Sequence, residues 1–247
     1  MDEEKIQKLR EFLDESQNIC VFTGAGISCP SGIPDFRSAD GLYNRESKYN
    51  YTPEEIISHS FFVSHTEMFY EFYKSAMLYP EAKPNKAHEF FASLENEGKK
   101  VTVVTQNIDG LHQLAGSQDV IELHGSVHRS YCTKCKKFFP LDYVAKSVGI
   151  PRCDEDGGIV KPDVVLYEEP LSGDSVFRAI SAIEKADTMI VVGTSLVVYP
   201  AASYIQYFKG KHLILINKSA TQYDGIAELT INCDVVKVVE ALTDKCN

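Results

Sequence analysis

The sequence predicts an α/β protein built on a doubly wound, mostly parallel sheet, with a helical insertion and a small cysteine-bearing module. Short apolar runs that read as buried strands alternate with helical segments along most of the 247 residues. Such alternation is typical of parallel sheets with helices on both faces. A polar stretch over about residues 130–160, which carries three cysteines, interrupts the pattern. We therefore expect one large domain with two insertions.

The expected elements follow one another in a regular order. A helix over residues 3–16 has its apolar side chains on one face, and NICVFT is the first strand. Residues 53–78 read as largely helical and rich in aromatic side chains, and a further helix is expected over 85–98. The remaining strands are predicted in KVTVVTQ, DVIELHG, TMIVVGTS, HLILIN and ELTINC.

The order of these elements suggests domain boundaries. We assign residues 1–37, 101–130 and 161–247 to the large domain. Residues 38–100 form the helical insertion together with a loop toward the sheet, and residues 131–160 form the small module.

Composition and charge narrow the class of protein. The net charge of −10 argues against a nucleic-acid partner and favours lysine-rich proteins or peptides. We expect no membrane span, because no apolar run approaches the required length. The N-terminal segment is acidic and amphipathic, unlike a signal peptide. The seven cysteines are therefore interpreted as thiols or metal ligands in a cytoplasmic protein.

A glycine turn directly follows the first strand. Gly24, Ala25 and Gly26 would let a phosphate approach bare backbone. The dinucleotide fingerprint has a third glycine where this chain has Cys29, and Pro30 interrupts the helix that should follow. The acidic residue that a dehydrogenase needs about twenty residues further on is also missing. The turn predicts nucleotide binding without hydride transfer.

Polar side chains follow several predicted strands at the point where each strand ends. Because the carboxyl ends of parallel strands meet at one edge of a sheet, these residues should line one crevice. They are Gln106, Asn107, Asp109, His124, Thr194, Ser195 and Asn217.

His124 is the candidate general base of this crevice. It follows a strand on the expected ligand side, next to a glycine, and an unperturbed imidazole titrates near neutral pH. An isolated histidine is more often a structural residue. We therefore interpret the other six as structural: His59, His65, His88, His112, His128 and His212.

Three cysteines have the spacing of metal ligands. Cys132 and Cys135 form a CxxC pair, and Cys153 follows 18 residues after Cys135. A redox dithiol would be expected at the start of a thioredoxin-like βα unit, which this pair does not follow. A structural zinc site is the favoured interpretation.

Taken together, these stretches resemble the sirtuins, the NAD-dependent protein deacylases. The matching motifs occur in the family's order and extend from about residue 4 to residue 240: GAGIS, GIPDFR, TQNIDGLH, LHG, GTSLVVYPAA and LILIN. The resemblance implies a Rossmann-like NAD-binding domain. It also implies cleavage of NAD, release of nicotinamide and transfer of an acyl group from lysine to ADP-ribose.

The resemblance also implies roles for the residues of the crevice. The catalytic residues would be His124, as the base, and Asn107. The turn at 24–26 would hold the pyrophosphate, with Cys29 beside the phosphates, and Ile108 and Asp109 would hold the nicotinamide carboxamide. Residues implied around the ribose, the phosphates and the adenosine half are Asp35, Phe36, Arg37, Gln106, Gly193, Thr194, Ser195, Asn217 and Asp234.

In the metal module this chain departs from the family. The family pattern places a fourth cysteine at position 156, where this chain has Asp156. A carboxylate can complete a zinc tetrahedron, although zinc favours sulfur, so the site should hold its metal less tightly than four thiolates. We expect one structural zinc ion on Cys132, Cys135, Cys153 and Asp156, with Glu155 or water as alternative fourth ligands.

The resemblance extends to the substrate. Family members that remove acidic acyl groups carry a Tyr-x-x-Arg pair, and by spacing its equivalent here is Tyr70 with Tyr73. Without an arginine, we expect neutral acyl groups, acetyl or longer. Acylated lysine would contact Val164, Val165 and Tyr167, the first two of which are equally compatible with strand core. Glu168 replaces the family's glycine and would favour basic peptides.

Two further functions remain open at this stage. A mono-ADP-ribosyltransferase would use the same cleavage of NAD with a different nucleophile. A non-catalytic NAD-binding module is disfavoured by the presence of Asn107, Asp109 and His124. The absence of long tails is compatible with a monomer.

Overall fold

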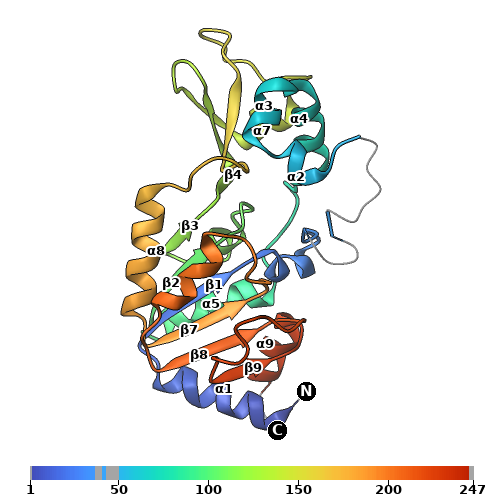
Figure 1. The fold of residues 1–247 in the computed structure, drawn as a ribbon. Coiled ribbons are helices and arrows are strands. Elements are labelled where there is room, and N and C mark those ends of the chain that lie inside the picture. Colours follow the sequence, from blue (N-terminus) through green and yellow to red (C-terminus); the bar gives the residue numbers. More distant parts are fainter. Residues whose placement is uncertain (1, 37–40, 43–49, 245–247) are drawn as a thin grey trace.

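The computed structural model describes residues 2–36, 41–42 and 50–244. It consists of a large domain, built on one parallel sheet, and a small domain above it in the view of Figure 1. The implied phosphate-loop residue Arg37 lies outside the described residues. Among the described helices, none combines the length and the apolar character that a bilayer span requires.

The large domain contains a six-stranded sheet in the order β3-β2-β1-β7-β8-β9. All neighbouring strands are parallel, and Val21 of the central strand lies opposite Val103 on one side and Ile190 on the other. This confirms the predicted doubly wound fold class. The strands are β1 (Asn18–Thr23), β2 (Lys100–Thr105), β3 (Val120–Glu122), β7 (Thr188–Val192), β8 (His212–Ile216) and β9 (Leu229–Ile231).

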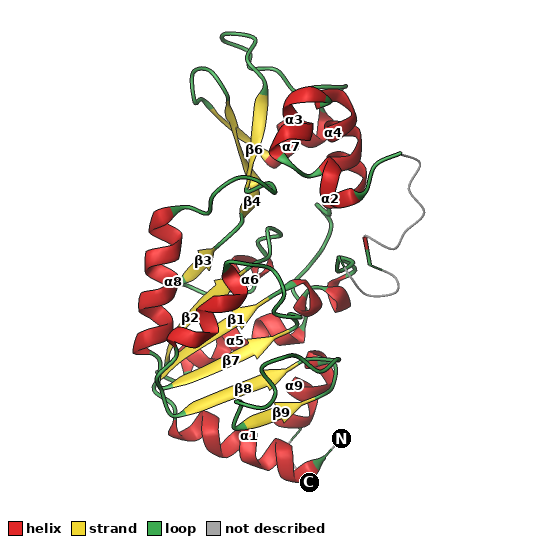
Figure 2. Ribbon diagram, in the orientation of Figure 1, coloured by secondary structure: helices red, strands yellow, loops and turns green. Residues whose placement is uncertain are grey.

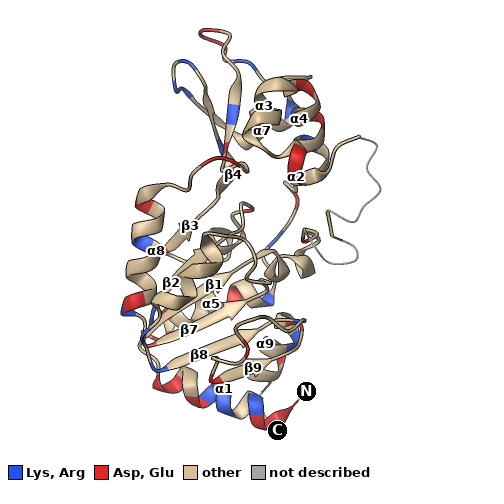
Figure 3. Ribbon diagram, viewed as in Figure 1, with Lys and Arg blue, Asp and Glu red and all other residues tan. Residues whose placement is uncertain are grey.

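Helices cover both faces of this sheet, which explains why its strands are apolar throughout. One face packs against α1 (Glu3–Glu15), α5 (Lys86–Asn96) and α9 (Val235–Thr243), and the other against α8 (Gly173–Lys185) and η5 (Ala201–Tyr207). The short helix α6 (Leu111–Leu114) follows β2. Figure 3 shows the charged residues mainly on the outer helices and connecting loops, and few on the strands.

The small domain combines the helical insertion with the cysteine-bearing module. Figure 2 shows its helices packed beside a separate sheet, whose three antiparallel strands have the order β5-β4-β6. One apolar core joins both parts, because Ile56 and Phe69 pack with Phe139 and Val160. The elements are α2 (Pro53–Ile56), α3 (His59–Ser64), α4 (Thr66–Phe72), the π turn η4 (Tyr73–Met77), β4 (Gly125–Cys132), β5 (Phe138–Pro140), α7 (Leu141–Lys146) and β6 (Val160–Val164).

The elements differ from the predicted ones in three places. The helical run over 53–78 is divided, because the Ser58 side chain accepts a hydrogen bond from the Phe61 N–H and begins a new helix. The helix α5 packs on the large sheet rather than with the helical insertion, since Phe91 belongs to the core beneath α1 and α9. The sheet of the small domain extends past residues 131–160 on both sides.

Candidate functional site

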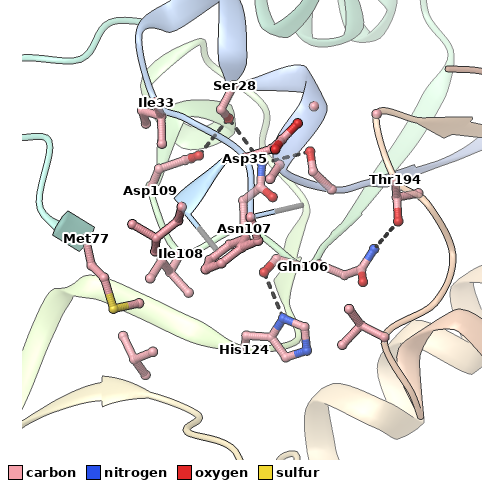
Figure 4. A pocket seen from close by; sticks show the side chains of 18 of the residues that line it. Ser28, Ile33, Asp35, Met77, Gln106, Asn107, Ile108, Asp109, His124 and Thr194 are labelled. Atoms are coloured by element: carbon pink, nitrogen blue, oxygen red, sulfur yellow. Dashed lines mark hydrogen bonds between the residues drawn. The ribbon is translucent and has the colours of Figure 1, made fainter. Parts of the chain in front are cut away.

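A cleft of about 1260 Å³ lies between the domains, at the carboxyl ends of the central strands of the large sheet. Figure 4 shows a number of the side chains that line it. Ligands of open α/β sheets bind at this edge. The structure brings together most of the predicted residues here: Gly24, Ala25, Gly26, Cys29, Asp35, Phe36, Gln106, Asn107, Ile108, Asp109, His124, Val164, Val165, Tyr167, Gly193, Thr194, Ser195 and Asn217.

The glycine turn packs against the turn after β7, backbone on backbone. The Gly26 N–H donates to the Gly193 carbonyl at 2.8 Å. A Cβ atom on Gly26 would lie 2.8 Å from the Gly193 Cα, and one on Gly193, at φ +59°, would lie 2.4 Å from the Ile27 nitrogen. Glycine is therefore required at both positions for the two turns to pack this closely. Both glycines line the cleft, where a phosphate can approach a backbone that carries no side chains.

A hydrogen-bonded network fixes the segment that follows β2. The Asn107 side-chain amide donates to the Gly24 carbonyl at 3.2 Å and to the Ser28 hydroxyl at 3.1 Å. Ser28 in turn donates to the Asp109 carboxylate at 2.7 Å, and the Leu111 N–H donates to its other oxygen at 2.9 Å. Burial raises the pKa of Asp109. Ser28 is not among the predicted site residues, although it lies inside the GAGIS segment.

His124 is held in one tautomer at the wall of the cleft. Its Nδ1 lies 2.8 Å from the Gln106 carbonyl, which can only accept, so Nδ1 carries the proton and Nε2 of the neutral ring is the acceptor. Burial lowers the pKa of His124, which keeps the ring neutral. The Gln106 side chain donates to the Thr194 hydroxyl at 3.0 Å, which links this wall to β7 (Figure 4).

The far end of the cleft differs in part from the prediction. Asn217 lines the cleft and donates to the Thr194 carbonyl at 3.2 Å. Asp234 is not among the described residues that line it: its carboxylate caps α9, accepts from the Val236 N–H at 2.9 Å and pairs with the Lys218 ammonium at 2.9 Å. Lys218, which sequence analysis did not single out, does line the cleft.

The four predicted metal ligands lie together. The Sγ atoms of Cys132, Cys135 and Cys153 and a carboxylate oxygen of Asp156 are all within 4.8 Å of one another. The Cys135 and Cys153 sulfurs are 3.7 Å apart, and tetrahedral zinc–sulfur bonds would place two sulfurs about 3.8 Å apart. The Gly158 N–H donates to the Asp156 carboxylate at 2.8 Å and orients it. The donor set fits one four-coordinate ion.

The predicted position of the acyl-selecting pair is wrong. Tyr70 and Tyr73 are buried in the core of the small domain, where the Tyr70 hydroxyl donates to the Val160 carbonyl. The π turn over residues 73–77 carries Ala76 and Met77 to the cleft instead. Figure 4 shows the Met77 side chain at the cleft. Both residues are neutral, and Lys74 of the same turn donates to the Ser147 and Gly149 carbonyls and does not line the cleft, so the turn presents no cation to the cleft.

Glu168 has a backbone conformation and a partner that the sequence did not indicate. Its backbone has φ +73°, a conformation that ordinarily favours glycine. Its carboxylate accepts from the Ser60 N–H at 2.8 Å and from the Ser60 hydroxyl at 2.9 Å. The neighbouring Tyr167 exchanges backbone hydrogen bonds with Ile57 and His59. The carboxylate thus ties the segment to the start of α3. Glu168 is also exposed and lines the cleft, so a preference for basic peptides stays a prediction.

The fold and the site define a class of protein: a nucleotide-binding α/β protein whose cleft is closed by a small domain with a metal-donor cluster. The chain belongs to the Sir2 family, whose family model matches residues 24–200.

Individual relatives agree with this assignment. The chain is 56% identical over 240 residues to an NAD-dependent protein deacetylase of Clostridium acetobutylicum. The aligned residues cover 97% of this chain and 98% of that protein. A solved structure of Sir2 with a deacetylated p53 peptide and 3′-O-acetyl-ADP-ribose has a TM-score of 0.87, 41% identity and 96% coverage of both chains. Another, of Sir2 bound to a propionylated peptide, has a TM-score of 0.84, 41% identity and 96% coverage of both.

Proposed function

We propose that this chain is an NAD-dependent protein-lysine deacylase, which cleaves NAD, releases nicotinamide and transfers the acyl group from lysine to ADP-ribose. The observation that carries the proposal is the position of His124. It lines the cleft next to the polar strand-end residues, and only its Nε2 is left to accept a proton. The names of the relatives support the same activity.

NAD would supply the ADP-ribosyl group that accepts the acyl group. The glycine turn would hold the pyrophosphate, because Gly24, Gly26 and Gly193 line the cleft and leave backbone groups there uncovered by side chains. Asp109 and Ile108 would hold the carboxamide, since Asp109 lines the cleft, is half-buried with a raised pKa, and is fixed through Ser28. Phe36 would exclude water from the reacting sugar, because its side chain packs against the core of the small domain.

His124 would take the proton from the ribose hydroxyl that receives the acyl group. Its neutral state is favoured by burial, and its orientation is fixed by the Gln106 carbonyl. Asn107, held between Gly24 and Ser28, would orient the ribose. Thr194, Ser195 and Asn217 would contact the adenosine half.

The metal-donor cluster would hold one structural zinc through Cys132, Cys135, Cys153 and Asp156. Its geometry fits a single tetrahedral ion. The role would be structural because Cys132 and Cys153 are buried in the core of the small domain and none of the four lines the cleft.

The substrate would be a lysine that carries a neutral acyl group. Apolar side chains of the small domain line that side of the cleft, among them Met77, Val127 and Val164. The segment at Val165 and Tyr167 would pair with an extended peptide. We place the protein in the cytoplasm, since its described cysteines form no disulfide bonds. We expect it to act as a monomer.

Mass spectrometry of the products tests this proposal. An acetyl-lysine peptide and NAD should yield the deacetylated peptide, nicotinamide and acetyl-ADP-ribose in equal amounts, and omission of NAD should abolish the reaction. Transfer of ADP-ribose to the protein or peptide without loss of the acetyl group would replace the proposal by the mono-ADP-ribosyltransferase alternative.

A further inference from the structure

The strand β4 is interrupted where it passes the cleft. Ser126 pairs with Asp163 and Ser130 pairs with the adjacent Pro162, so residues 127–129 form a bulge that has no counterpart on β6. Bulges redirect side chains and are frequent beside functional sites. All three residues of this bulge make contacts with the large domain.

The contacts of the bulge reach the segment that follows β2. The Val127 N–H donates to the Ile108 carbonyl at 3.0 Å. The Nε2 of His128 lies 2.9 Å from the Asp109 carbonyl and therefore donates to it. The third residue, Arg129, pairs with Glu122 at the end of β3 at 2.6 Å.

The segment is shaped to receive the His128 ring. Gly110 has φ +74°, and a Cβ atom there would lie 2.7 Å from the His128 ring. Glycine is therefore required for the ring to reach the Asp109 carbonyl. Both His128 and Asp109 line the cleft.

We propose that His128 is a positioning residue. Its hydrogen bond to Asp109 and that of the Val127 N–H to Ile108, together called the latch, hold this segment in place and so shape the nicotinamide end of the cleft. The latch joins the small domain to the segment on which nicotinamide recognition depends. This inference rests on the proposed function for the roles of Ile108 and Asp109, and it revises our interpretation of His128 as merely structural.

Three variants test the latch. His128→Phe keeps an aromatic ring but has no donor, whereas His128→Gln keeps an N–H donor at a similar distance from the backbone. The control, His65→Phe, changes an exposed histidine of the small domain that does not line the cleft. If His128→Phe does not fold, His128→Val removes the donor with a residue suited to a strand.

We expect His128→Phe to raise the KM for NAD and the nicotinamide concentration for half-inhibition by up to about tenfold, the upper range of the net contribution of one hydrogen bond. The KM for the acetyl-lysine peptide should be unchanged. His128→Gln and His65→Phe should resemble the wild type. When Asp109→Asn is already present, adding His128→Phe should raise the KM for NAD and the half-inhibitory nicotinamide concentration by a smaller factor, because the two residues act together.

Hydrogen exchange provides a readout that does not depend on activity. Amides within residues 106–111 should exchange faster in His128→Phe than in the wild type, and at the wild-type rate in His65→Phe. The latch is overturned if His128→Phe leaves exchange and nicotinamide inhibition unchanged, or if His128→Gln is as impaired as His128→Phe. A wild-type protein that never consumes NAD would overturn the proposed function, while faster exchange in His128→Phe would still establish the contact.

Discussion

The two domains differ in the interactions that stabilise each of them. The large domain depends on a parallel sheet that is buried on both faces, with apolar clusters that join residues from the N-terminal to the C-terminal helices. The small domain has short helices, a three-stranded sheet and one apolar cluster, which includes the thiols of Cys132 and Cys153. A small core commonly needs a metal or another cross-link for stability. We infer that burial stabilises the large domain and that metal binding adds to burial in the small one.

The same difference continues into the cleft. The large domain presents backbone and polar side chains in fixed positions, such as the Gly26 turn and Asn107. The small domain presents apolar side chains such as Met77 and Val164. Nucleotide chemistry should therefore depend mainly on the large domain, and acyl selection mainly on the small one. Each prediction below can contradict this division or refine it.

The largest effect is expected at His124, which stands where the chain crosses between the domains. His124→Ala should lower kcat by about 10²–10⁴-fold, the range for loss of a general base. The melting temperature should be unchanged, as should the activity of the matched control His65→Ala. A His124→Ala enzyme with nearly wild-type turnover would remove the histidine from the mechanism.

The pH dependence of the reaction follows from the same residue. The base must be unprotonated, so activity should be lost as pH falls through its pKa. Because burial lowers the pKa of His124, the acidic limb of kcat/KM should lie below pH 6.5, the ordinary value for histidine. A profile that already declines above that pH would show that another group limits the reaction.

Metal removal should destabilise the small domain selectively. Cys135→Ser or a strong chelator should remove zinc and lower the free energy of unfolding of that domain by several kcal/mol, since metal binding is coupled to folding. Hydrogen exchange should then increase in β4–β6 and not in β1, β2 and β7.

A matched pair of variants identifies the fourth ligand. Asp156→Ala should weaken zinc binding at least about tenfold, and Asp156→Cys should strengthen it, because zinc favours sulfur. Glu155→Ala should have little effect, since Glu155 pairs with Lys137 in the structure. The zinc content of each purified variant and competition for zinc with a chromogenic chelator measure these changes in affinity. Equal effects of Asp156→Ala and Glu155→Ala would contradict the assignment.

A buried histidine pair should make the large domain sensitive to acid. The His88 and His112 rings lie 4.8 Å apart, and burial lowers the pKa of His88 to about 4 and that of His112 to about 3. The unfolded chain takes up protons near pH 6.5 and the folded chain does not, so stability is full above that pH and declines below it. His88 alone should account for roughly 3 kcal/mol between pH 6.5 and 4.

Urea midpoints measured across this pH range test that sensitivity. His88→Asn keeps an acceptor for the Asn85 N–H, which bonds to the His88 Nδ1, but it does not titrate. The variant should show a shallower decline in stability with falling pH than the wild type. An unchanged slope would exclude His88 as the source.

The smallest effect is expected for the choice of acyl group among neutral chains. Acetyl and propionyl peptides should both react, and a succinyl peptide should react at least about tenfold more slowly, because its carboxylate finds no cation on the π turn at Ala76 and Met77. Met77→Ala should shift the preference toward longer chains by a few-fold. A succinyl peptide that reacts faster than the acetyl peptide would overturn this assignment.

Much of the fold could be predicted because its signals are local. Apolar strands between helices indicate a parallel sheet, and the CxxC pair with Cys153 indicates a metal site. The π turn could not be predicted, because Tyr70 and Tyr73 have the same helical spacing whether they face the cleft or the core. Only packing in the aromatic cluster of the small domain turned them inward. Likewise, nothing local to Glu168 indicated that Ser60 would hold its carboxylate.

The sequence by itself determined the sheet, the order of its motifs, the family resemblance and the set of side chains at the strand ends, since these depend on periodicity and on short spacings. Tertiary structure alone decided the partners of the histidines and brought His128 to the cleft. His124 and His128 are four residues apart in the chain, yet one is fixed by the Gln106 carbonyl and the other reaches the Asp109 carbonyl through a bulge. Such partners are brought together by long-range packing, which no local pattern in the chain encodes.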